Sequence, residues 1–572
     1  MLFKLSTRYL RDHALPVATV IVLQILTTFA ALSLPTLNAN IIDKGVVAGD
    51  IAYIWRTGGE MLAISAVQVL AAVTTAYLGS RTAMAVGQAL RRDMFHQVQQ
   101  YGSLEISQFS PPSLITRTTN DIQQIQMVLV MTFTIMVQVP IMLVGGVVMA
   151  MRQDIELSWL LVAIIPLLAG IMGFASTRLG PLFRQMQDRL DGITTVLREQ
   201  LTGVSVIRAF VKQDDERTRY EKANRDLQDT GLRTGLIMAM LFPGVTLVVF
   251  AAQVGVIYFG GLRVDAGAVE IGSLVAFLNY LMQIFMSVMM AMMMFMMVPR
   301  AEVCAVRAHE VLSTQPTIRT AETARPLPDG PLTFALSDVS FRFPGAEEDV
   351  LSHIDLALPP GTTTAIIGST GAGKTTLVNL FPRLLDPTAG AVTANGIPLI
   401  ELDLSVRERI ALVPQRAFLF TGTVGSNLRL ADAQATDEQL WEALRVAQAT
   451  EFVQSLDDPV EAGGKNFSGG QRQRLTIARA LVRRADLTVF DDSFSALDYA
   501  TDATLRRELV TYLEGRSVLI VGQRVATIRA ADVIVVLDDG RIVGRGTHAE
   551  LMETSPTYQE IVLSQLTAEE AA

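Results

Sequence analysis

The chain has 572 residues, of which 50% are hydrophobic and 18% charged, and its formal net charge at pH 7 is −9. This charge, without clusters of Lys and Arg, argues against a nucleic-acid-binding protein, because binding phosphates requires a basic surface. The long uncharged stretches lie before about residue 300, and the remainder has ordinary charge density, so the sequence predicts two parts that face two different solvents.

The N-terminus resembles the start of a signal peptide, because Lys4, Arg8 and Arg11 precede an apolar run over 14–37. The apolar core of a signal peptide has only about 7–15 residues. The run is longer than that, and we therefore expect a retained first membrane span.

Six segments are long and apolar enough to cross a bilayer as helices, which takes about 20 residues each. They are 14–37, 58–80, 128–150, 157–177, 236–260 and 271–298. Apart from Glu60, near the start of the second, none has a charged residue in its centre. The sequence predicts an all-α transmembrane domain of six helices over residues 1–312.

Lys and Arg in the connections predict the orientation, since basic residues are retained on the cytoplasmic side. The 178–234 segment holds eleven of them, whereas the loops near 151–156 and 261–270 hold one each, Arg152 and Arg263. We expect both termini to be cytoplasmic.

Two long basic connections, 81–127 and 178–235, keep helical apolar spacing, and we expect them to extend the spans into the cytoplasm. Each is interrupted, at FSPPSL around Pro111 and Pro112 and at VKQDDER around Asp214. These interruptions are either short elements that contact another domain or solvated turns, and the residues alone leave both open.

The sixth span holds nine methionines between Met282 and Met297. Methionine is unbranched and polarisable, which favours a surface that repacks around varied apolar substrates, but the same residues are compatible with lipid-facing packing. Four uncharged polar residues within the spans are expected to face other helices or a water-filled cavity: Gln138, Gln253, Asn279 and Gln283. The single cysteine, Cys304, is interpreted as a packing residue.

A proline-rich linker over 313–331 precedes a soluble domain predicted over 332–566, with a tail at 567–572. In this domain AIIGSTGAGKTTL places glycines between an apolar strand and a helix, the context of a phosphate-binding loop. The loop residues are Gly368, Ser369, Thr370, Gly371, Ala372, Gly373, Lys374, Thr375 and Thr376.

The loop and a later acid predict an ATP and magnesium site. Glycines allow backbone N–H groups to approach phosphates at a helix N-terminus, Lys374 is expected to contact the β- and γ-phosphates, and Thr375 to bind Mg²⁺. About 115 residues later, LTVFDD reads as a buried strand that ends in acids, so Asp491 is predicted to hold Mg²⁺ through water.

Between these elements, NFSGGQRQRLTIARAL resembles the signature of ATP-binding cassette (ABC) proteins, with Ser468, Gly469, Gly470 and Gln471 matching it. The resemblance extends over the soluble half. Further matches are a base-stacking aromatic, Phe343, a magnesium- and catalytic-site glutamine, Gln415, and Asp498 at the end of SALD.

The resemblance implies an α/β P-loop cassette with a RecA-like core and with helical and antiparallel β subdomains. It also implies that two cassettes dimerise head to tail, so that each ATP lies between one phosphate loop and the signature of the other chain. The six-span half is similar to the membrane domain of bacterial exporters, and this favours coupling contacts at 104–114 and 211–217.

Two residues depart from the family pattern. Asp492 stands where a glutamate usually polarises the attacking water, and Gln523 stands where a histidine usually contacts the γ-phosphate. Glutamine cannot exchange a proton in the manner of histidine. We predict firm ATP binding and slow hydrolysis at this loop, with an intact signature lent to a different partner subunit; the alternative is a homodimer in which Asp492 suffices.

The predicted function is ATP-driven export of hydrophobic or amphipathic compounds, drugs or lipids, by a heterodimer in the bacterial inner membrane. Siderophore import on the same fold stays open, as does a regulatory subunit that binds ATP while its partner performs the chemistry. The six spans exclude a soluble cassette of translation or DNA repair.

Overall fold

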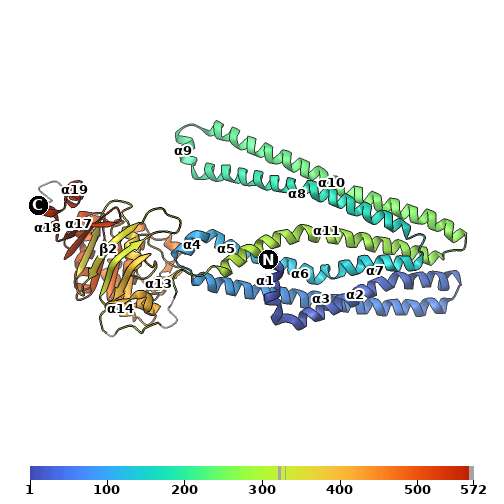
Figure 1. The fold of residues 1–572 in the computed structure, drawn as a ribbon, viewed down its shortest axis with the longest axis horizontal. Helices are drawn as coiled ribbons and strands as arrows, with labels where there is room; N and C mark the ends of the chain where they lie inside the picture. The colour runs from blue at the N-terminus through green and yellow to red at the C-terminus, as the bar shows by residue number, and fades with distance from the viewer. Residues whose placement is uncertain (320–323, 329, 566–572) are drawn as a thin grey trace. The chain divides into compact units, whose positions relative to one another are not determined.

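The computed structural model describes residues 1–319, 324–328 and 330–565 (Figure 1). The predicted tail at 567–572 and parts of the linker lie outside the described residues. The chain divides into two compact units, and each is described by itself. The helical unit comprises Met1–Val98 and Pro112–Thr314, and the α/β unit comprises Gln99–Pro111 and the chain from Gln315 onward.

Long helices and short helical segments between them make up the helical unit. In chain order they are α1 (Leu2–Leu10), α2 (Ala14–Asn40), α3 (Ile51–Gln99), α5 (Pro111–Thr116), α6 (Ile122–Met131), α7 (Gln138–Gln153), α8 (Trp159–Thr202), α9 (Val204–Ala209), α10 (Gln213–Asp265) and α11 (Ile271–Ser313). Within the described residues, six helical stretches are long and apolar enough to cross a membrane, and each overlaps one predicted span. The prediction of six spans is confirmed.

The helices run well beyond the apolar segments, and the two predicted interruptions are breaks between helices. The first break is at Ser110, where a φ of 62° ends one helix and Pro111 begins α5. The second lies at Phe210–Lys212, just before Asp214. Asp214 itself is in the first turn of α10, where the helix dipole favours acidic side chains.

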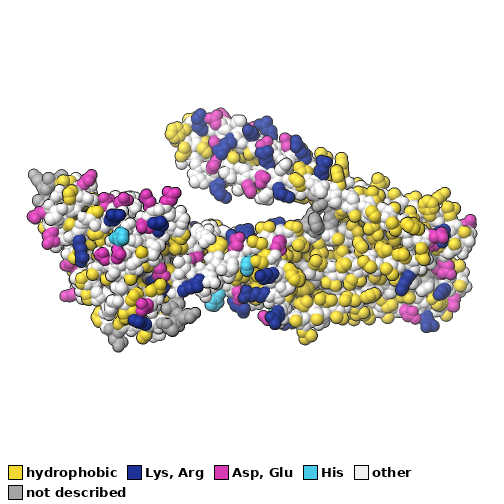
Figure 2. All heavy atoms as spheres, in the orientation of Figure 1, with side chains coloured by type: hydrophobic (Ala, Val, Ile, Leu, Met, Phe, Trp, Pro, Cys, Tyr) yellow, Lys and Arg dark blue, Asp and Glu magenta, His cyan; other side chains and the backbone are white. Residues whose placement is uncertain are grey.

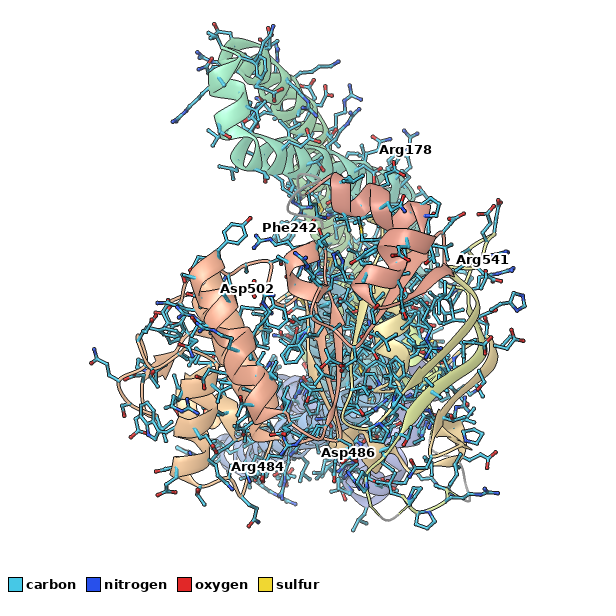
Figure 3. All side chains as sticks on the ribbon, turned by 90° about the vertical axis from the view of Figure 1, so that its left-hand side faces the viewer. Arg178, Phe242, Arg484, Asp486, Asp502 and Arg541 are labelled. Atoms are coloured by element: carbon cyan, nitrogen blue, oxygen red, sulfur yellow. The ribbon has the colours of Figure 1, made fainter. Side chains whose placement is uncertain are left out.

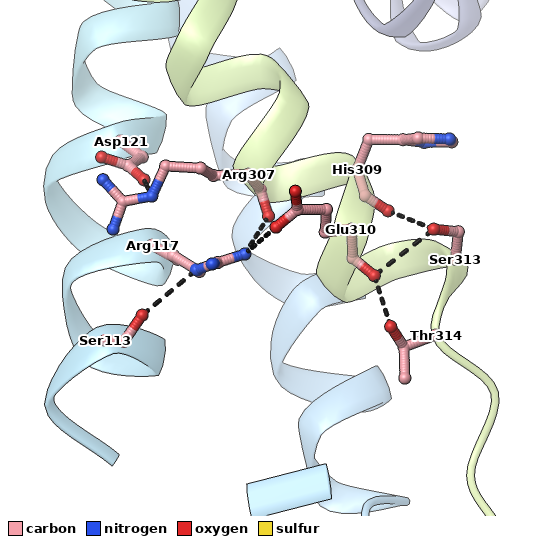
Figure 4. A network of polar contacts seen from close by, with 8 residues as sticks. All are labelled: Ser113, Arg117, Asp121, Arg307, His309, Glu310, Ser313 and Thr314. Carbon is pink, nitrogen blue, oxygen red and sulfur yellow. Dashed lines mark hydrogen bonds and ion pairs between the residues drawn. The ribbon is translucent and has the colours of Figure 1, made fainter. Parts of the chain in front are cut away.

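Three short π-helical segments interrupt the α-helical hydrogen bonding of the spans: η2 (Ile41–Val47), η3 (Arg117–Asp121) and η4 (Thr132–Met136). Side chains of η3 are joined to α11 (Figure 4). Arg117 Nη1 donates to Glu310 Oε2 at 2.7 Å, and Arg307 pairs with the buried Asp121 at 3.3 Å. These ion pairs hold the π-helical segment against the last helix.

The core of the helical unit lies among α2, α7, α8, α10 and α11, where Leu32, Val256, Phe277 and Ile284 are buried. Figure 1 shows α8 and α10 side by side along their length, joined by α9. Hydrophobic side chains cover the surface of the apolar segments, whereas Lys, Arg, Asp and Glu gather on the extensions of α8 and α10 (Figure 2). An uncharged outer surface of this kind is suited to contact with lipid.

Within its described residues, the α/β unit contains three sheets. The antiparallel sheet has the order β2 (Leu351–Leu358), β1 (Phe334–Phe341), β4 (Ala389–Ala394), β5 (Ile397–Pro398). The six-stranded sheet has the order β12 (Arg541–Gly546), β11 (Val533–Asp538), β3 (Thr363–Ile367), β10 (Ser517–Val521), β9 (Leu487–Asp491), β6 (Ile410–Val413). A small sheet pairs β7 (Gly422–Thr423) with β8 (Pro459–Val460).

Helices surround these sheets. They are α4 (Ser103–Phe109), α12 (Lys374–Leu380), α13 (Val424–Leu428), α14 (Asp437–Val446), α15 (Gly469–Val482), α16 (Tyr499–Tyr512), α17 (Val525–Ile528), α18 (His548–Thr554) and α19 (Pro556–Leu563). One core lies between the antiparallel sheet, α12 and the six-stranded sheet, and a second lies among α14, α15 and α16. The predicted fold, a six-helix membrane domain joined to an α/β cassette, is confirmed.

The strand order positions the site. Strands β3, β10, β9 and β6 are neighbours and parallel, so their carboxyl ends meet at one edge of the sheet. Asp491 lies opposite Val521, and Phe490 opposite Val413. At the opposite edge Asp486, which is labelled in Figure 3, precedes β9. Asp486 secures the chain there by accepting a hydrogen bond from Leu332 N at 3.2 Å.

Candidate nucleotide site

The phosphate loop lies between β3 and α12, as predicted from the sequence. Gly371 and Gly373 have φ values of 91° and 92°, in the left-handed region that favours glycine. A Cβ at Gly368 would lie 1.9 Å from Leu537 O, so that position also requires glycine for close backbone packing. The loop therefore has the open backbone that a phosphate cradle needs.

Lys374 folds back over this loop. Its Nζ donates to Gly368 O at 2.8 Å and to Ser369 O at 2.6 Å. Burial lowers the pKa of Lys374, while the negative charges of Asp492 and Asp491 act in the opposite direction. An ammonium group held at the mouth of the loop fits the charge of nucleotide phosphates.

Thr375 and Asp491 are brought together as a candidate magnesium site. Thr375 Oγ1 donates to Asp491 Oδ1 at 3.3 Å, and Asp491 is buried. Burial raises the pKa of Asp491. A hydroxyl and a carboxylate beside a phosphate loop are the oxygen ligands that Mg²⁺ takes together with phosphate and water, so these residues fit the ion.

The carboxylate of Asp492 accepts hydrogen bonds from two glutamine side chains. Gln523 Nε2 donates to Asp492 Oδ2 at 2.7 Å, and Gln415 Nε2 lies 3.3 Å from the same oxygen. Burial raises the pKa of Asp492, and the hydrogen bond from Gln415 and the charge of Lys374 oppose this shift. Gln415 after β6 and Gln523 after β10 thus converge on one carboxylate oxygen of Asp492, which follows β9.

The signature begins α15. Ser468 caps this helix in a reciprocal pair with Gln471, in which Ser468 N donates to Gln471 Oε1 at 2.9 Å and Gln471 N donates to Ser468 Oγ at 3.3 Å. A Cβ at Gly470 would lie 3.2 Å from Ala496 O, whereas one at Gly469 would meet no described atom within 4 Å. Gly469 therefore offers open space on this chain's surface.

Two further predicted residues lie outside the cluster around Asp492. Asp498 is exposed and caps α16 by accepting a hydrogen bond from Thr501 N at 3.0 Å, and this bond lowers its pKa. Phe343 follows β1 and is 39% exposed, with its ring edge-on to Phe341. Among the described residues, no hydrogen bond or ion pair joins the signature to the phosphate loop.

Comparisons with known proteins agree with this geometry. Residues 17–288 match the family described as "ABC transporter transmembrane region", and residues 351–495 match the family described as "ABC transporter". An uncharacterized ABC transporter ATP-binding protein of Mycobacterium tuberculosis is 46% identical over 99% of this chain and 98% of its own length. The chain belongs to the ABC transporter family.

Other similar proteins include relatives with named activities. An ATP-dependent lipid A-core flippase of Chromobacterium violaceum is 30% identical over 91% of this chain and 90% of its own length. A multidrug efflux ATP-binding/permease protein of Mycobacterium tuberculosis is 31% identical over 94% of this chain and 45% of its own length.

A solved structure of a bacterial Atm1-family ABC exporter with ATP bound matches the fold of this chain. The TM-score is 0.77, with 20% identity over 97% of this chain and 98% of that one. This ABC transporter is therefore a multi-pass membrane protein with the exporter fold, in which the membrane domain and the ATP-binding domain that drives transport are fused in one chain.

Two features of this ABC transporter were not predicted from its sequence. Gln565 holds the segment that carries Gln523, because its Nε2 donates to Gln523 O at 2.7 Å and its Oε1 accepts from Val525 N at 2.9 Å. No motif surrounds Gln565, so only the folded chain reveals the contact. The segment at 104–114 was expected to contact another domain, but the residue that anchors it, Glu105, was not identified.

Helix α4 belongs to the α/β unit. Glu105 is buried and accepts hydrogen bonds from Gly102 N at 2.7 Å, from Thr317 N at 2.9 Å and from Thr317 Oγ1. Burial alone would raise the pKa of Glu105, but these hydrogen bonds outweigh it and hold the pKa below its usual value. Leu104 packs against the core of the same unit.

Proposed function

We propose that this ABC transporter chain is one subunit of an ATP-driven exporter of hydrophobic or amphipathic small molecules, drugs or lipids. Its partner is a second, different half-transporter. Both termini and the α/β unit lie in the cytoplasm, and the spans lie in the inner membrane of a bacterium. Its own phosphate loop binds ATP and hydrolyses it slowly, while its signature serves the partner's site.

The observation that carries this proposal is the pair of amides on Asp492. A general base needs a free lone pair within hydrogen-bond reach of the attacking water. Asp492 is one methylene shorter than glutamate, and its Oδ2 accepts from Gln523 and Gln415, so only Oδ1 is left to take a proton from the attacking water. Positioned acid–base groups contribute about 10²–10⁴-fold to rate, so we expect a loss of this order at the chain's own site.

Binding is a separate matter from hydrolysis. Lys374 would hold the phosphates, and Thr375 and Asp491 would hold Mg²⁺, which supplies charge neutralisation on the phosphates when bound. None of these three residues departs from the expected pattern. The open space at Gly469 supports a signature that receives the nucleotide held by a partner's loop.

The substrate class is proposed from the membrane half and from the named relatives. No span has a charged residue at its centre, which favours uncharged or amphipathic cargo. The relatives named as a lipid A-core flippase and a multidrug efflux protein support the same class. Transport into inverted vesicles would establish export, and uptake in the opposite direction would favour siderophore import.

The test is Mg²⁺-dependent ATP hydrolysis by the purified chain in lipid, alone and with the product of a neighbouring transporter gene. We expect the chain alone to bind ATP and to hydrolyse it at least about 100-fold more slowly than the pair. A rate for the chain alone that equals that of the pair would contradict the proposal and would indicate a homodimer with a competent Asp492.

A second candidate is a regulatory subunit, which the occupied Asp492 also favours. Restoring the usual residues with the double variant Asp492→Glu, Gln523→His in the pair distinguishes the two. The exporter proposal expects this variant to hydrolyse ATP at its own loop when the partner's site is inactivated. The regulatory hypothesis expects turnover to change little.

A further inference from the structure

A pocket lies in the helical unit between α7 and α11, with a volume of about 260 Å³. Four methionines contribute to its wall: Met142, Met282, Met286 and Met290. The last three are spaced at four-residue intervals on α11, so they share one face of that helix. Part of the methionine-rich stretch thus lines an open pocket, although Met286 and Met290 are themselves exposed.

The same wall contains an unpaired polar atom. Gln283 Nε2 donates to Ala31 O of α2 at 3.2 Å, and this bond sets the orientation of the amide, because a flip would place two oxygens against each other. Gln283 Oε1 is buried and has no hydrogen-bond partner among the described residues. A buried acceptor without a donor is costly, and a ligand that supplies a donor removes that cost.

Neighbouring polar groups do not supply this donor. Ser287 Oγ donates to Gln283 O at 2.8 Å, and Asn279 Nδ2 donates to Val275 O at 3.0 Å. These two residues are engaged with the backbone of their own helix, as helix packing requires. Gln283 Oε1 is therefore left without a donor from either of these two neighbours.

We infer that this pocket binds a neutral aromatic group that carries a hydrogen-bond donor, with the donor directed to Gln283 Oε1 and the ring against the methionine sulfurs. None of the described lining residues is charged, so a charged group would be left uncompensated. Thioether sulfur makes favourable contacts with aromatic rings, and flexible methionine side chains can move aside to admit the ligand to Oε1.

The size of the pocket limits the ligand further. Whole drug-sized ligands occupy about 300–1,000 Å³. A pocket of about 260 Å³ therefore holds one ring-bearing portion of a larger amphiphile, or a small bicyclic molecule entirely. This inference deepens the proposed function, because it defines the substrate class at one site in the membrane half.

Two probes of matched shape test the inference: 2-naphthol, which has a hydroxyl donor, and 2-methoxynaphthalene, which has none. Binding is measured by ligand fluorescence with the full chain in lipid nanodiscs and without nucleotide, after subtraction of partitioning into empty nanodiscs. We expect 2-naphthol to bind about 3- to 10-fold more tightly, the effect of one neutral hydrogen bond. Equal affinities would overturn the inference without any variant.

The variant Gln283→Leu is expected to reduce the affinity ratio to about one, by removal of the acceptor. The matched control is Gln253→Leu on α10, a span glutamine outside the pocket, which should keep the wild-type ratio. The double variant Met286→Leu, Met290→Leu should weaken both probes and keep the ratio. A ratio that survives Gln283→Leu would contradict the inference.

The outcome is separable from that of the proposed function, because the binding assay needs neither ATP nor a partner. Gln283-dependent binding without transport by the pair would refute only the exporter proposal. Transport of hydrophobic compounds without Gln283-dependent selectivity would refute only the pocket.

Discussion

At the residue scale, two adjacent acids take different environments. Asp491 ends β9 and faces Thr375, whereas Asp492 has a φ of 47° and turns to Gln415 and Gln523. A positive φ is uncommon for a residue other than glycine and often marks a functional position. The backbone therefore separates a carboxylate that fits metal binding from one that is held by amides.

The raised pKa of Asp491 predicts how nucleotide binding depends on pH. The ionised form holds Mg²⁺, and burial raises the pKa above the usual value of about 3.9, so protonation begins at a higher pH than for an exposed aspartate. We expect the Mg²⁺-dependent part of ATP binding to be present at neutral pH and to be lost as the pH falls through the raised pKa.

Binding of a fluorescent ATP analogue, with and without Mg²⁺ over a pH series, checks this expectation. The variant Asp491→Asn is the control, because it removes the titrating carboxylate and leaves only the titration of the nucleotide itself. Identical curves for the two proteins would show that Asp491 does not hold the ion.

The residues of the nucleotide site were predictable one motif at a time, but their mutual contacts were not. The glycines before Lys374 are recognisable in the sequence, and the phosphate loop needs them because its backbone adopts positive φ values. The meeting of Gln415 and Gln523 on Asp492 depends on the strand order and on the register of β9 with its neighbours. That order is a tertiary property, and Gln565 had no local signal at all.

At the scale of elements, hydropathy predicted the six spans because helices in lipid must be apolar over about 20 residues. It did not predict η2, η3 or η4. A π-helical turn accommodates an extra residue without changing the apolar character of the segment, so composition is insensitive to it. The network at Arg117 and Glu310 shows one such turn held by charged partners from α11.

Helix α4 gives the prediction at this scale. The carboxylate of Glu105 accepts three hydrogen bonds, and replacement by glutamine removes its negative charge. Hydrogen bonds to charged groups are worth about 1.5–3 kcal/mol. We expect amide hydrogen exchange in Ser103–Phe109 to accelerate about tenfold or more in the full chain.

The matched control is Gln108→Ala, an exposed position on the same helix, which should leave exchange unchanged. Because the folded-state pKa of Glu105 is lowered, its contribution to stability is present above the unfolded-state pKa and is lost as the pH falls through the folded-state value. Unchanged exchange in Glu105→Gln would show that the apolar contact of Leu104 alone holds α4.

At the scale of the whole molecule, the proposed dimer requires surfaces that one chain leaves uncovered. The break after α9 exposes Phe210 and Val211, with exposed fractions of 72% and 79%. Exposed apolar side chains on an otherwise charged extension favour an interaction site. We expect this break, which adjoins the coupling region predicted at 211–217, to contact the cassette of the partner subunit.

The variant Phe210→Ser tests this contact in the assembled pair. We expect substrate-stimulated ATP hydrolysis to fall about 10-fold or more, the loss typical of an interface anchor, while ATP binding stays unchanged. The control is Phe174→Ser, because Phe174 is also exposed but lies within a span, away from the break. Stimulation that survives Phe210→Ser would remove the coupling role from this segment.

The division of the chain into two units also limits how chimeras of this protein can be designed. Residues Gln99–Pro111 belong to the α/β unit although about 200 residues separate them from the rest of it. A chimera that exchanges the C-terminal region at the linker would pair a foreign cassette with the original α4 and Glu105. Exchangeable modules of this protein are therefore discontinuous in the gene, and a functional chimera must carry both pieces from the same parent.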